Sequence, residues 1–223
     1  VGFDLNAACS GFLFAYNTAQ AYISSGIFRT VLVIGAESLS RLVDWEDRNT
    51  CILFGDGAGA VLLKAKNSTF YLPATHSDGS GGMALTCNGT ADIHPFNKDA
   101  GPEKNLSYIH MNGKEVFQFA IRKVPQVIEE VLQKNNLTKE EIRWFILHQA
   151  NSRIVDAVSR RLKVDIEKFP MNLQEYGNTS SASIPILLDE LNQKGVLLKG
   201  QKLVLAGFGA GLSWGASILE WDI

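Results

Sequence analysis

A cysteine between a strand-like segment and a helix-like segment is the first feature of this sequence that could do chemistry. Cys9 lies in "LNAACSGFLFAYNTAQAYISSG", residues 5–26, where apolar residues recur at helical spacing from residue 11 to residue 25. At a helix start, unpaired N–H groups and the helix dipole stabilise a thiolate. Such a position can lower the pKa of a cysteine from about 8.5 into a range of roughly 3.5 to 7.5. The alternative is an inert core cysteine, because free cysteines are often buried.

A histidine and an asparagine far along the chain are the second candidate group. His148 ends the apolar run "WFILH", which predicts a place at the carboxyl end of a strand, where open α/β sheets keep their ligand crevices. Asn178 lies in "EYGNTSSASIP", a turn just before a predicted helix. A structural histidine and a turn-forming asparagine are the alternatives for these two residues.

Two glycine-rich segments could bind an anionic group with their backbone. "GDGAGA" at 55–60 lacks the Lys-Ser/Thr of a P-loop and the spacing of a dinucleotide site, so a tight turn between two strands explains it better. "GFGAG" at 207–211 is expected to be a similar turn, or one side of an oxyanion hole.

A third candidate is a basic helix face that follows His148. Apolar residues of 152–162 fall on one face at 100° per residue, while Arg153 and Arg160 are nearly aligned on the opposite one. Arg161 and Lys163 flank them, and Asp156 is the one acidic residue of this helix. The pattern predicts a positive patch for an acidic partner, with a solvated helix face as the alternative.

The elements that must position these residues alternate between strands and helices. Residues 1–7 alternate in polarity and predict a strand, and "VLVIGAE" at 31–37 predicts a buried strand that pairs with it in parallel across the helix. Two apolar runs around a glycine-rich turn occur twice, at 51–65 and at 202–221. This repetition predicts two related α/β halves. The other expected elements are a strand at 142–147, helices at 114–134, 152–162 and 183–193, and a loop at 76–108 that forms a lid or channel wall.

Composition excludes several function classes. The net charge of −2 offers no general attraction for nucleic acid or anionic lipid. The three cysteines, 9, 51 and 87, show no metal-ligand spacing, so we expect no metal site, and Cys51 and Cys87 are expected to be inert. No long apolar span is present, which favours a cytoplasmic protein without membrane contact. The chain starts at Val1 within the strand pattern, and we expect it to be part of a longer protein.

Six motifs in one order closely resemble the β-ketoacyl-acyl carrier protein synthase III family, the initiating condensing enzymes of bacterial fatty acid synthesis. They are "AACSGF", "DWEDRNT", "LFGDGAGAVLL", "LHQANSRI", "EYGNTSSASIP" and "GFGAGLSWG". The resemblance covers essentially the whole chain. It implies an α/β thiolase-like fold with two repeated halves in five layers. The expected halves are residues 1–66, with the nucleophile, and 67–223, with the histidine and the asparagine, and an N-terminal part of the first half is expected to be missing.

The resemblance also assigns roles to residues. Cys9 resembles the family's acyl-accepting nucleophile, and His148 and Asn178 resemble its decarboxylation pair. The oxyanion hole would use the backbone N–H groups of Cys9 and Ala210. The residues expected to contact substrate are Arg48 (CoA), Phe54 (acyl pocket) and Phe208 (beside the pair), and those expected to contact the carrier protein are Arg153, Arg160 and Arg161.

The family implies a Claisen condensation of a short acyl-CoA with malonyl-acyl carrier protein, which gives β-ketoacyl-acyl carrier protein, CO2 and CoA. No cofactor is expected, and the expected partners are acyl-CoA, acyl carrier protein and a second copy of the chain. Asn178 occupies the place where thiolases carry a cysteine and elongating synthases a histidine. A condensing enzyme of polyketide or hydroxymethylglutaryl-CoA type and a truncated, non-catalytic carrier-protein-binding homologue are the alternatives.

Overall fold

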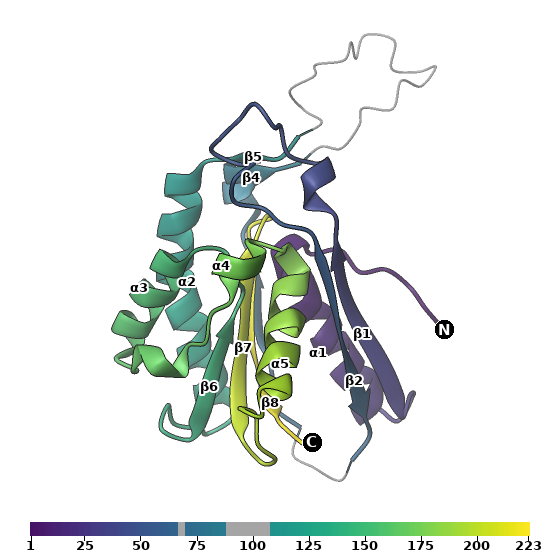
Figure 1. Cartoon of the computed structure of the whole chain (residues 1–223). Helices are drawn as coiled ribbons and strands as arrows, with labels where there is room; N and C mark the ends of the chain where they lie inside the picture. Colours follow the sequence, from purple (N-terminus) through teal and green to yellow (C-terminus); the bar gives the residue numbers. More distant parts are fainter. Residues whose placement is uncertain (67–69, 88–107) are drawn as a thin grey trace.

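The described part of the chain forms alternating layers of helices and sheets (Figure 1). The computed structural model describes residues 1–66, 70–87 and 108–223. Helices α2 (Gly113–Lys134) and α3 (Ser152–Leu162) lie on the outer side of a four-stranded sheet. Helices α1 (Gly11–Ser24) and α5 (Ser183–Gln193) lie between that sheet and a separate strand pair. The four-stranded sheet and the separate strand pair therefore pack against the same central pair of helices.

The four-stranded sheet has the order β3-β8-β7-β6. Its strands are β3 (Ala74–Ser77), β6 (Ile142–Leu147), β7 (Lys202–Gly209) and β8 (Ser213–Glu220). β7 is apolar and buried along nearly its whole length, because helices cover both of its faces. β6 and β7 are parallel, and the chain between them contains α3, the short helix α4 (Leu173–Tyr176) and α5. The carboxyl end of β6 therefore lies beside that of β7.

The second sheet is the antiparallel pair β1 (Thr30–Glu37) and β2 (Gly57–Lys64). One face packs on the central helices, while the other exposes apolar side chains such as Leu32 and Ile34. A further short pair, β4 (Leu85–Thr86) and β5 (His110–Met111), lies near the start of α2.

Asparagine side chains cap the first turns of α2 and α3. Asn112 accepts a hydrogen bond from the Glu115 N–H at the start of α2, and Asn151 accepts one from the Arg153 N–H at the start of α3. Beyond α1, Gly26 has φ +76°, a conformation that favours glycine. The helices expected at 152–162 and 183–193 have these bounds in the structure, and α2 continues through Pro125.

Three expectations about the first 65 residues are wrong. Residues 1–7 form no strand in the described structure and their apolar side chains are exposed, since a strand needs a partner for its backbone groups. Consequently β1 makes no parallel pair with 1–7 and instead runs antiparallel to β2. The segment "GDGAGA" is no tight turn, because Gly57–Ala60 belongs to β2. A Cβ at Gly59 would lie 2.8 Å from the backbone nitrogen of Ile186, so the glycine lets α5 approach β2 closely.

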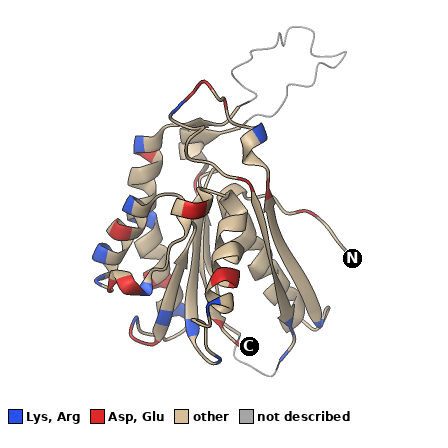
Figure 2. Ribbon diagram, viewed as in Figure 1, with Lys and Arg blue, Asp and Glu red and all other residues tan. Residues whose placement is uncertain are grey.

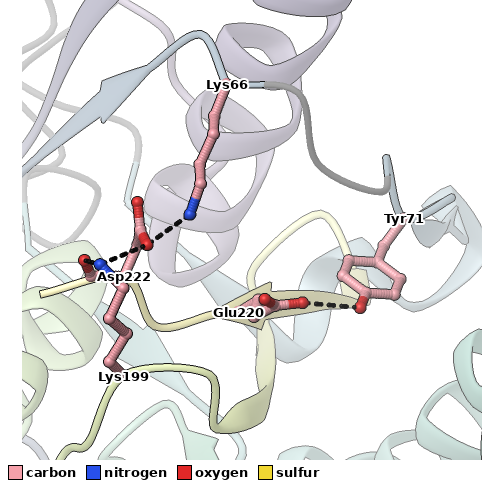
Figure 3. A network of polar contacts seen from close by, with 5 residues as sticks. All are labelled: Lys66, Tyr71, Lys199, Glu220 and Asp222. Atoms are coloured by element: carbon pink, nitrogen blue, oxygen red, sulfur yellow. Dashed lines mark hydrogen bonds and ion pairs between the residues drawn. The ribbon is translucent and has the colours of Figure 1, made fainter.

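The end of the chain is fixed by a polar network (Figure 3). Asp222 pairs with Lys66 at 2.5 Å and with Lys199 at 3.3 Å. The Tyr71 hydroxyl donates to the Glu220 carboxylate at 3.2 Å. These contacts join the end of β8 to the segments that follow β2 and precede β7, away from the carboxyl ends of β6 and β7.

Some expectations concern residues that the structure does not describe. The loop expected at 76–108 is described as far as residue 87, where it contains β3, a 3₁₀ turn (Gly79–Ala84) and β4, and residues 88–107 lie outside the described ranges. The division into halves at residues 66 and 67 stays a prediction. Among the described residues, no helix is long and apolar enough to cross a membrane. The same ranges contain no group of three His, Cys, Asp or Glu side chains that could hold a metal ion.

Candidate active site

Cys9 lies in a tight turn directly before α1. The turn is the 3₁₀ segment η1 (Ala8–Ser10), and the helix begins at Gly11. Ala8 has φ +47°, in the left-handed region that alanine rarely adopts. Such conformations cost on the order of 1–3 kcal/mol and are concentrated at functional sites. The predicted position of the cysteine at the start of a helix is therefore confirmed, although an irregular segment precedes it.

The structure contradicts the expected lowering of the Cys9 pKa. Burial raises the pKa of Cys9 to about 11, the Ser180 side chain lowers it part of the way through a hydrogen bond, and the Glu37 carboxylate opposes ionisation further. Only 8% of the Cys9 surface is exposed. We expected a low pKa because Cys9 lies at the start of a helix. The loss of water around the buried sulfur is the larger effect, and it raises the pKa. Cys9 is therefore a thiol at neutral pH before substrate binds.

The hairpin between β7 and β8 packs directly on Cys9. A Cβ at Gly209 would lie 2.7 Å from the Cβ of Cys9 and 3.2 Å from its sulfur. The Ser10 hydroxyl donates to the Ser213 carbonyl at 3.1 Å, and the Ser213 hydroxyl donates to the Ala210 carbonyl at 3.0 Å. The start of α1 and the end of the hairpin's first strand are thus held together, although residues 207–209 of "GFGAG" belong to β7 and only the residues after them turn.

His148 follows the last residue of β6, at the predicted carboxyl end of a strand. Its backbone N–H donates to the Ala206 carbonyl of β7 at 2.8 Å. The ring is 2% exposed, and burial lowers its pKa to about 4, so it is neutral at pH 7. Its Nδ1 lies 2.7 Å from the Ser183 hydroxyl oxygen, and its ring centroid lies 5.2 Å from that of Phe208. The Ser183 hydroxyl thus engages Nδ1, and the Ser180 backbone also hydrogen-bonds the ring.

Asn178 is held by its backbone and by its side-chain oxygen. Its N–H donates to the Leu53 carbonyl at 2.8 Å, and its own carbonyl accepts from the Gly55 N–H at 2.9 Å. The Oδ1 atom accepts from the Ser180 N–H at 2.9 Å. Because Oδ1 is used in this way, the amide orientation is fixed and the Nδ2 hydrogens are directed elsewhere. The side chain therefore presents a donor.

Ser180 brings the three candidate residues together. It hydrogen-bonds Cys9 through its side chain, Asn178 through its N–H, and the Ser183 hydroxyl, which contacts His148, through its carbonyl. Ser180 has φ +49°, a second left-handed residue at this site. A thiol, an imidazole and an amide from three distant parts of the sequence thus surround one serine. An acyl-accepting sulfur beside two neutral donors suits acyl transfer through a negatively charged oxygen.

The residues expected to contact substrate lie at different distances from this centre. Phe208 is buried and packs edge-on against His148. Phe54 forms an isolated backbone bridge with Asn178 and packs against the small apolar cluster of Leu39, Val43 and Ile109. Ala210 is outside the left-handed region, so its Cβ carries no strain. Arg48 is exposed in the turn that precedes Phe54, and the structure shows no contact between it and Cys9, His148 or Asn178.

The basic residues of α3 are exposed, as predicted, but the surface is not uniformly positive. The guanidinium of Arg153 lies over the Phe117 ring at 5.7 Å. Figure 2 shows acidic and basic segments mixed around α3 and the turn after it. Arg160 and Arg161 are exposed near that turn, which carries Asp165 and Glu167. The prediction considered only the charges within the helix and did not include these acids, so Arg153 is the better candidate for an acidic partner.

Four residues of the site were missed by the sequence interpretation. Ser180, Ser183 and Glu37 contact or orient the candidate residues, and Gly209 makes room for Cys9. The Glu37 carboxylate accepts from the Ser181 hydroxyl at 2.6 Å and so links β1 to the segment that carries Asn178. The run of serines in "NTSSAS" was a usable signal for the first two, whereas Glu37 becomes visible only once β1 is placed.

Two family models match most of this chain. Residues 3–90 match the model described as 3-oxoacyl-[acyl-carrier-protein (ACP)] synthase III, and residues 132–221 match its C-terminal model. The β-ketoacyl-[acyl-carrier-protein] synthase III of Clostridium acetobutylicum is 46% identical over 220 residues, which are 98% of this chain and 67% of the relative.

Solved structures agree with the sequence comparison. The 3-oxoacyl-[acyl-carrier-protein] synthase III from Aquifex aeolicus VF5 has a TM-score of 0.88 and 42% identity, over 98% of this chain and 67% of that one. The priming β-ketosynthase from the R1128 polyketide biosynthetic pathway has a TM-score of 0.92 and 34% identity, over 100% of this chain and 66% of that one.

Proposed function

This chain belongs to the 3-oxoacyl-[acyl-carrier-protein] synthase III family, and we propose that Cys9 carries the acyl group while His148 and Asn178 stabilise the enolate. The fold is thiolase-like α/β and the activity is that of an acyltransferase, β-ketoacyl-acyl carrier protein synthase III. It condenses an acyl-CoA primer with malonyl-acyl carrier protein in the initiation of fatty acid synthesis. The meeting of the three side chains around Ser180 is the observation that supports these roles.

In the first half-reaction, the Cys9 sulfur attacks the thioester carbonyl of acyl-CoA. The bond between the carbonyl carbon and the CoA sulfur breaks, and the proton that Cys9 loses ends on the released CoA thiol. The N–H groups of Cys9 and Ala210 would hold the negatively charged oxygen of the intermediate. Storage of the acyl group on the enzyme divides one difficult condensation into two easier steps.

In the second half-reaction, malonyl-acyl carrier protein loses CO2 and forms an enolate. Nε2–H of His148 and Nδ2–H of Asn178 would donate to the thioester oxygen on which this charge develops. Both donors are neutral, since burial keeps the pKa of His148 near 4, so the enolate keeps its nucleophilicity. The enolate carbon attacks the acyl carbonyl on Cys9, the carbon–sulfur bond breaks, and the released Cys9 thiolate takes up a proton from solvent, because the pKa of Cys9 is about 11.

The likeness to the R1128 priming ketosynthase supports a second candidate function, priming in a polyketide pathway. Product analysis separates the two functions. The chain would be incubated with acetyl-CoA or longer acyl-CoAs and with either malonyl-acyl carrier protein or malonyl-CoA. Acetoacetyl-acyl carrier protein as the main product supports initiation of fatty acid synthesis, whereas condensation with malonyl-CoA in preference to malonyl-acyl carrier protein supports the polyketide-type role.

Several finer features are proposals that rest on the family resemblance. Arg48 would contact CoA, Phe54 and Phe208 would line the substrate site, and Arg153 with Arg160 and Arg161 would meet the acidic carrier protein. No cofactor is needed for the steps above. We also propose a cytoplasmic homodimer, whose size sedimentation analysis of the purified protein would measure.

Two variants test the proposed roles directly. Cys9→Ser is expected to abolish acyl transfer from labelled acetyl-CoA. Asn178→Ala is expected to lower decarboxylation of malonyl-acyl carrier protein by about 10²- to 10³-fold, the usual loss for one such donor. Acyl transfer by Cys9→Ser, or decarboxylation by Asn178→Ala at the wild-type rate, would show that these assignments are wrong.

A further inference from the structure

The segment between β1 and β2, residues 38–56, forms a loop whose two limbs are joined by one carboxylate. Glu37 and Gly57, which flank the loop, are partners in the strand register, so the two limbs start side by side. Asp56, the last residue of the loop, accepts the Ser40 N–H at 2.8 Å through Oδ1. Its Oδ2 accepts the Ser40 hydroxyl at 2.5 Å. The end of the second limb thus holds the beginning of the first.

Asp56 supplies a cap that the local sequence does not provide. Leu39–Arg41 is a 3₁₀ turn, and the first N–H groups of such a turn have no partner within it. Ser38, which precedes the turn, makes no side-chain hydrogen bond to it. The N–H groups of Leu39 and Ser40 donate instead to Asp56. Hydrogen bonds from the Ser40 hydroxyl and N–H lower the pKa of Asp56, so it is a carboxylate at neutral pH, and charged acceptors make the stronger hydrogen bonds.

Each limb of the loop also has an anchor that does not involve Asp56. The first limb is held by a hydrogen bond from the Ile109 N–H to the Leu42 carbonyl at 2.8 Å. The second limb is held by the two backbone hydrogen bonds that join it to Asn178. Loss of the Asp56 carboxylate should therefore leave Asn178 in place and release only the connection between the two limbs.

The middle of the loop is a turn that is held by its own polar groups. The Asp44 carbonyl accepts the Asp47 N–H at 3.1 Å. The Asp47 carboxylate accepts the Asn49 N–H at 3.0 Å and the Thr50 hydroxyl at 2.9 Å. Arg48 lies within this turn and is exposed. Because the turn is bonded internally, the two limbs that carry it decide where Arg48 is placed.

We propose that Asp56 is a positioning residue for acyl-CoA recognition, which joins the two limbs of the loop and thereby places Arg48. This inference rests on the proposed function, in which Arg48 contacts CoA. Asp56 would act through Arg48 and not by touching the substrate. Decarboxylation of malonyl-acyl carrier protein involves no CoA, so this step should be independent of Asp56.

The first test compares the two half-reactions in variants of Asp56. Asp56→Ala should raise KM for acetyl-CoA by about tenfold, the order of loss expected when hydrogen bonds to a charged acceptor are removed. Decarboxylation of malonyl-acyl carrier protein should keep the wild-type rate. Asp56→Asn keeps one carbonyl oxygen as an acceptor and should recover part of the loss. Ser40→Ala removes the hydroxyl but leaves the backbone hydrogen bond, so its KM should rise less.

Hydrogen exchange of the full chain gives a second readout, which does not depend on activity. The N–H groups of residues 39–50 should exchange faster in Asp56→Ala, while those of residues 53–55 keep their protection. Asp165→Ala is the matched control, because Asp165 is also an exposed carboxylate that accepts a turn N–H, that of Glu167 at 3.0 Å. It should change neither KM for acetyl-CoA nor exchange in the loop.

An unchanged KM for acetyl-CoA in Asp56→Ala would overturn the proposal. Equal loss of both half-reactions in the folded variant would overturn it too, because a merely structural role predicts that result. If Asp56→Ala does not fold, Asp56→Asn gives the same comparison. Failure of the proposed function is a separate result, in which the wild type transfers no acetyl group from CoA to Cys9, and exchange of residues 39–50 in Asp56→Ala still tests whether the carboxylate joins the limbs.

Discussion

Gly209 lies so close to Cys9 that any side chain at this position would meet the nucleophile: a Cβ there would be 3.2 Å from the Cys9 sulfur. The end of β7, the first strand of this hairpin, therefore has a direct chemical task. It brings the backbone of the glycine-rich turn to the sulfur, where an acyl group would be attached. Backbone contact of this kind is possible only where one side chain is missing.

We predict that Gly209→Ala displaces Cys9 and strongly slows acyl transfer, while the protein stays folded. Overpacking of this kind costs about 1–3 kcal/mol. Gly207→Ala is the matched control on the same strand, because its Cβ would lie 3.4 Å from the nearest atom, Cα of Ser10. Thermal melting and acetyl transfer should be measured for both variants. Equal acyl transfer by the two would contradict the importance of the contact.

Cys9 should react slowly with iodoacetamide at neutral pH. Its thiol is buried and has a pKa of about 11, whereas Cys87 is exposed and Cys51 is partly exposed. Labelling of Cys9 should therefore be the slowest of the three at pH 7 and should rise as the pH approaches 11. Peptide mapping after timed labelling measures this order. Fast labelling of Cys9 at pH 7 would mean that the sulfur is ionised in the absence of substrate.

The Glu37 carboxylate should hold back ionisation of Cys9. Glu37→Gln removes the negative charge and keeps an oxygen that can accept from the Ser181 hydroxyl. The pKa of Cys9 should then fall, so the alkylation profile of Cys9 should move to lower pH. Glu37→Ala removes both the charge and the acceptor for the Ser181 hydroxyl. Only this second variant should also lose the hydrogen bond that holds the Ser181 segment to β1. A profile that stays in place in Glu37→Gln would exclude the electrostatic effect.

His148 should make folding sensitive to mild acid. Its pKa is about 4 in the folded protein against 6.5 for an unperturbed histidine, so the unfolded chain binds the proton more tightly between these values. The free energy of unfolding is therefore unaffected by this histidine above pH 6.5. It should fall by about 3 kcal/mol in total as the pH falls toward 4. Urea unfolding at pH 7 and pH 4 measures it. His148→Gln lacks this titration and should lose less stability over the same interval.

Arg153 should recognise the carrier protein rather than the CoA substrate. Arg153→Glu is expected to raise KM for malonyl-acyl carrier protein by about tenfold, which corresponds to about 1.4 kcal/mol, while KM for acetyl-CoA stays the same. Arg29→Glu makes the same charge change in an exposed residue just before β1 and should have no effect. Equal increases for both substrates in Arg153→Glu would argue against a docking role.

The sequence allowed the site to be predicted better than the surroundings that control it. Helix periodicity located α3 and α5, and residue type and motif singled out Cys9, His148 and Asn178, which the fold brings together around Ser180. Residues 1–7 alternate like a strand, but alternation cannot supply the partner that a strand needs. The pKa of Cys9 was misjudged because burial depends on Gly209 and Ser180, which lie about 200 and 170 residues away in the sequence and reach the sulfur only through the fold. The prediction of a positive surface at α3 was likewise incomplete, because Asp165 and Glu167 belong to the turn that follows the helix.

The central claim is that the sulfur of Cys9 accepts the acyl group, and intact-protein mass spectrometry after incubation with acetyl-CoA tests it most directly. The wild type should gain the mass of one acetyl group, peptide mapping should place it on Cys9, and malonyl-acyl carrier protein should remove it. Cys9→Ala should gain nothing under the same conditions, while Cys51→Ala and Cys87→Ala should behave as the wild type. Acetylation of Cys51 or Cys87 instead, or of a correctly folded Cys9→Ala protein, would contradict the account.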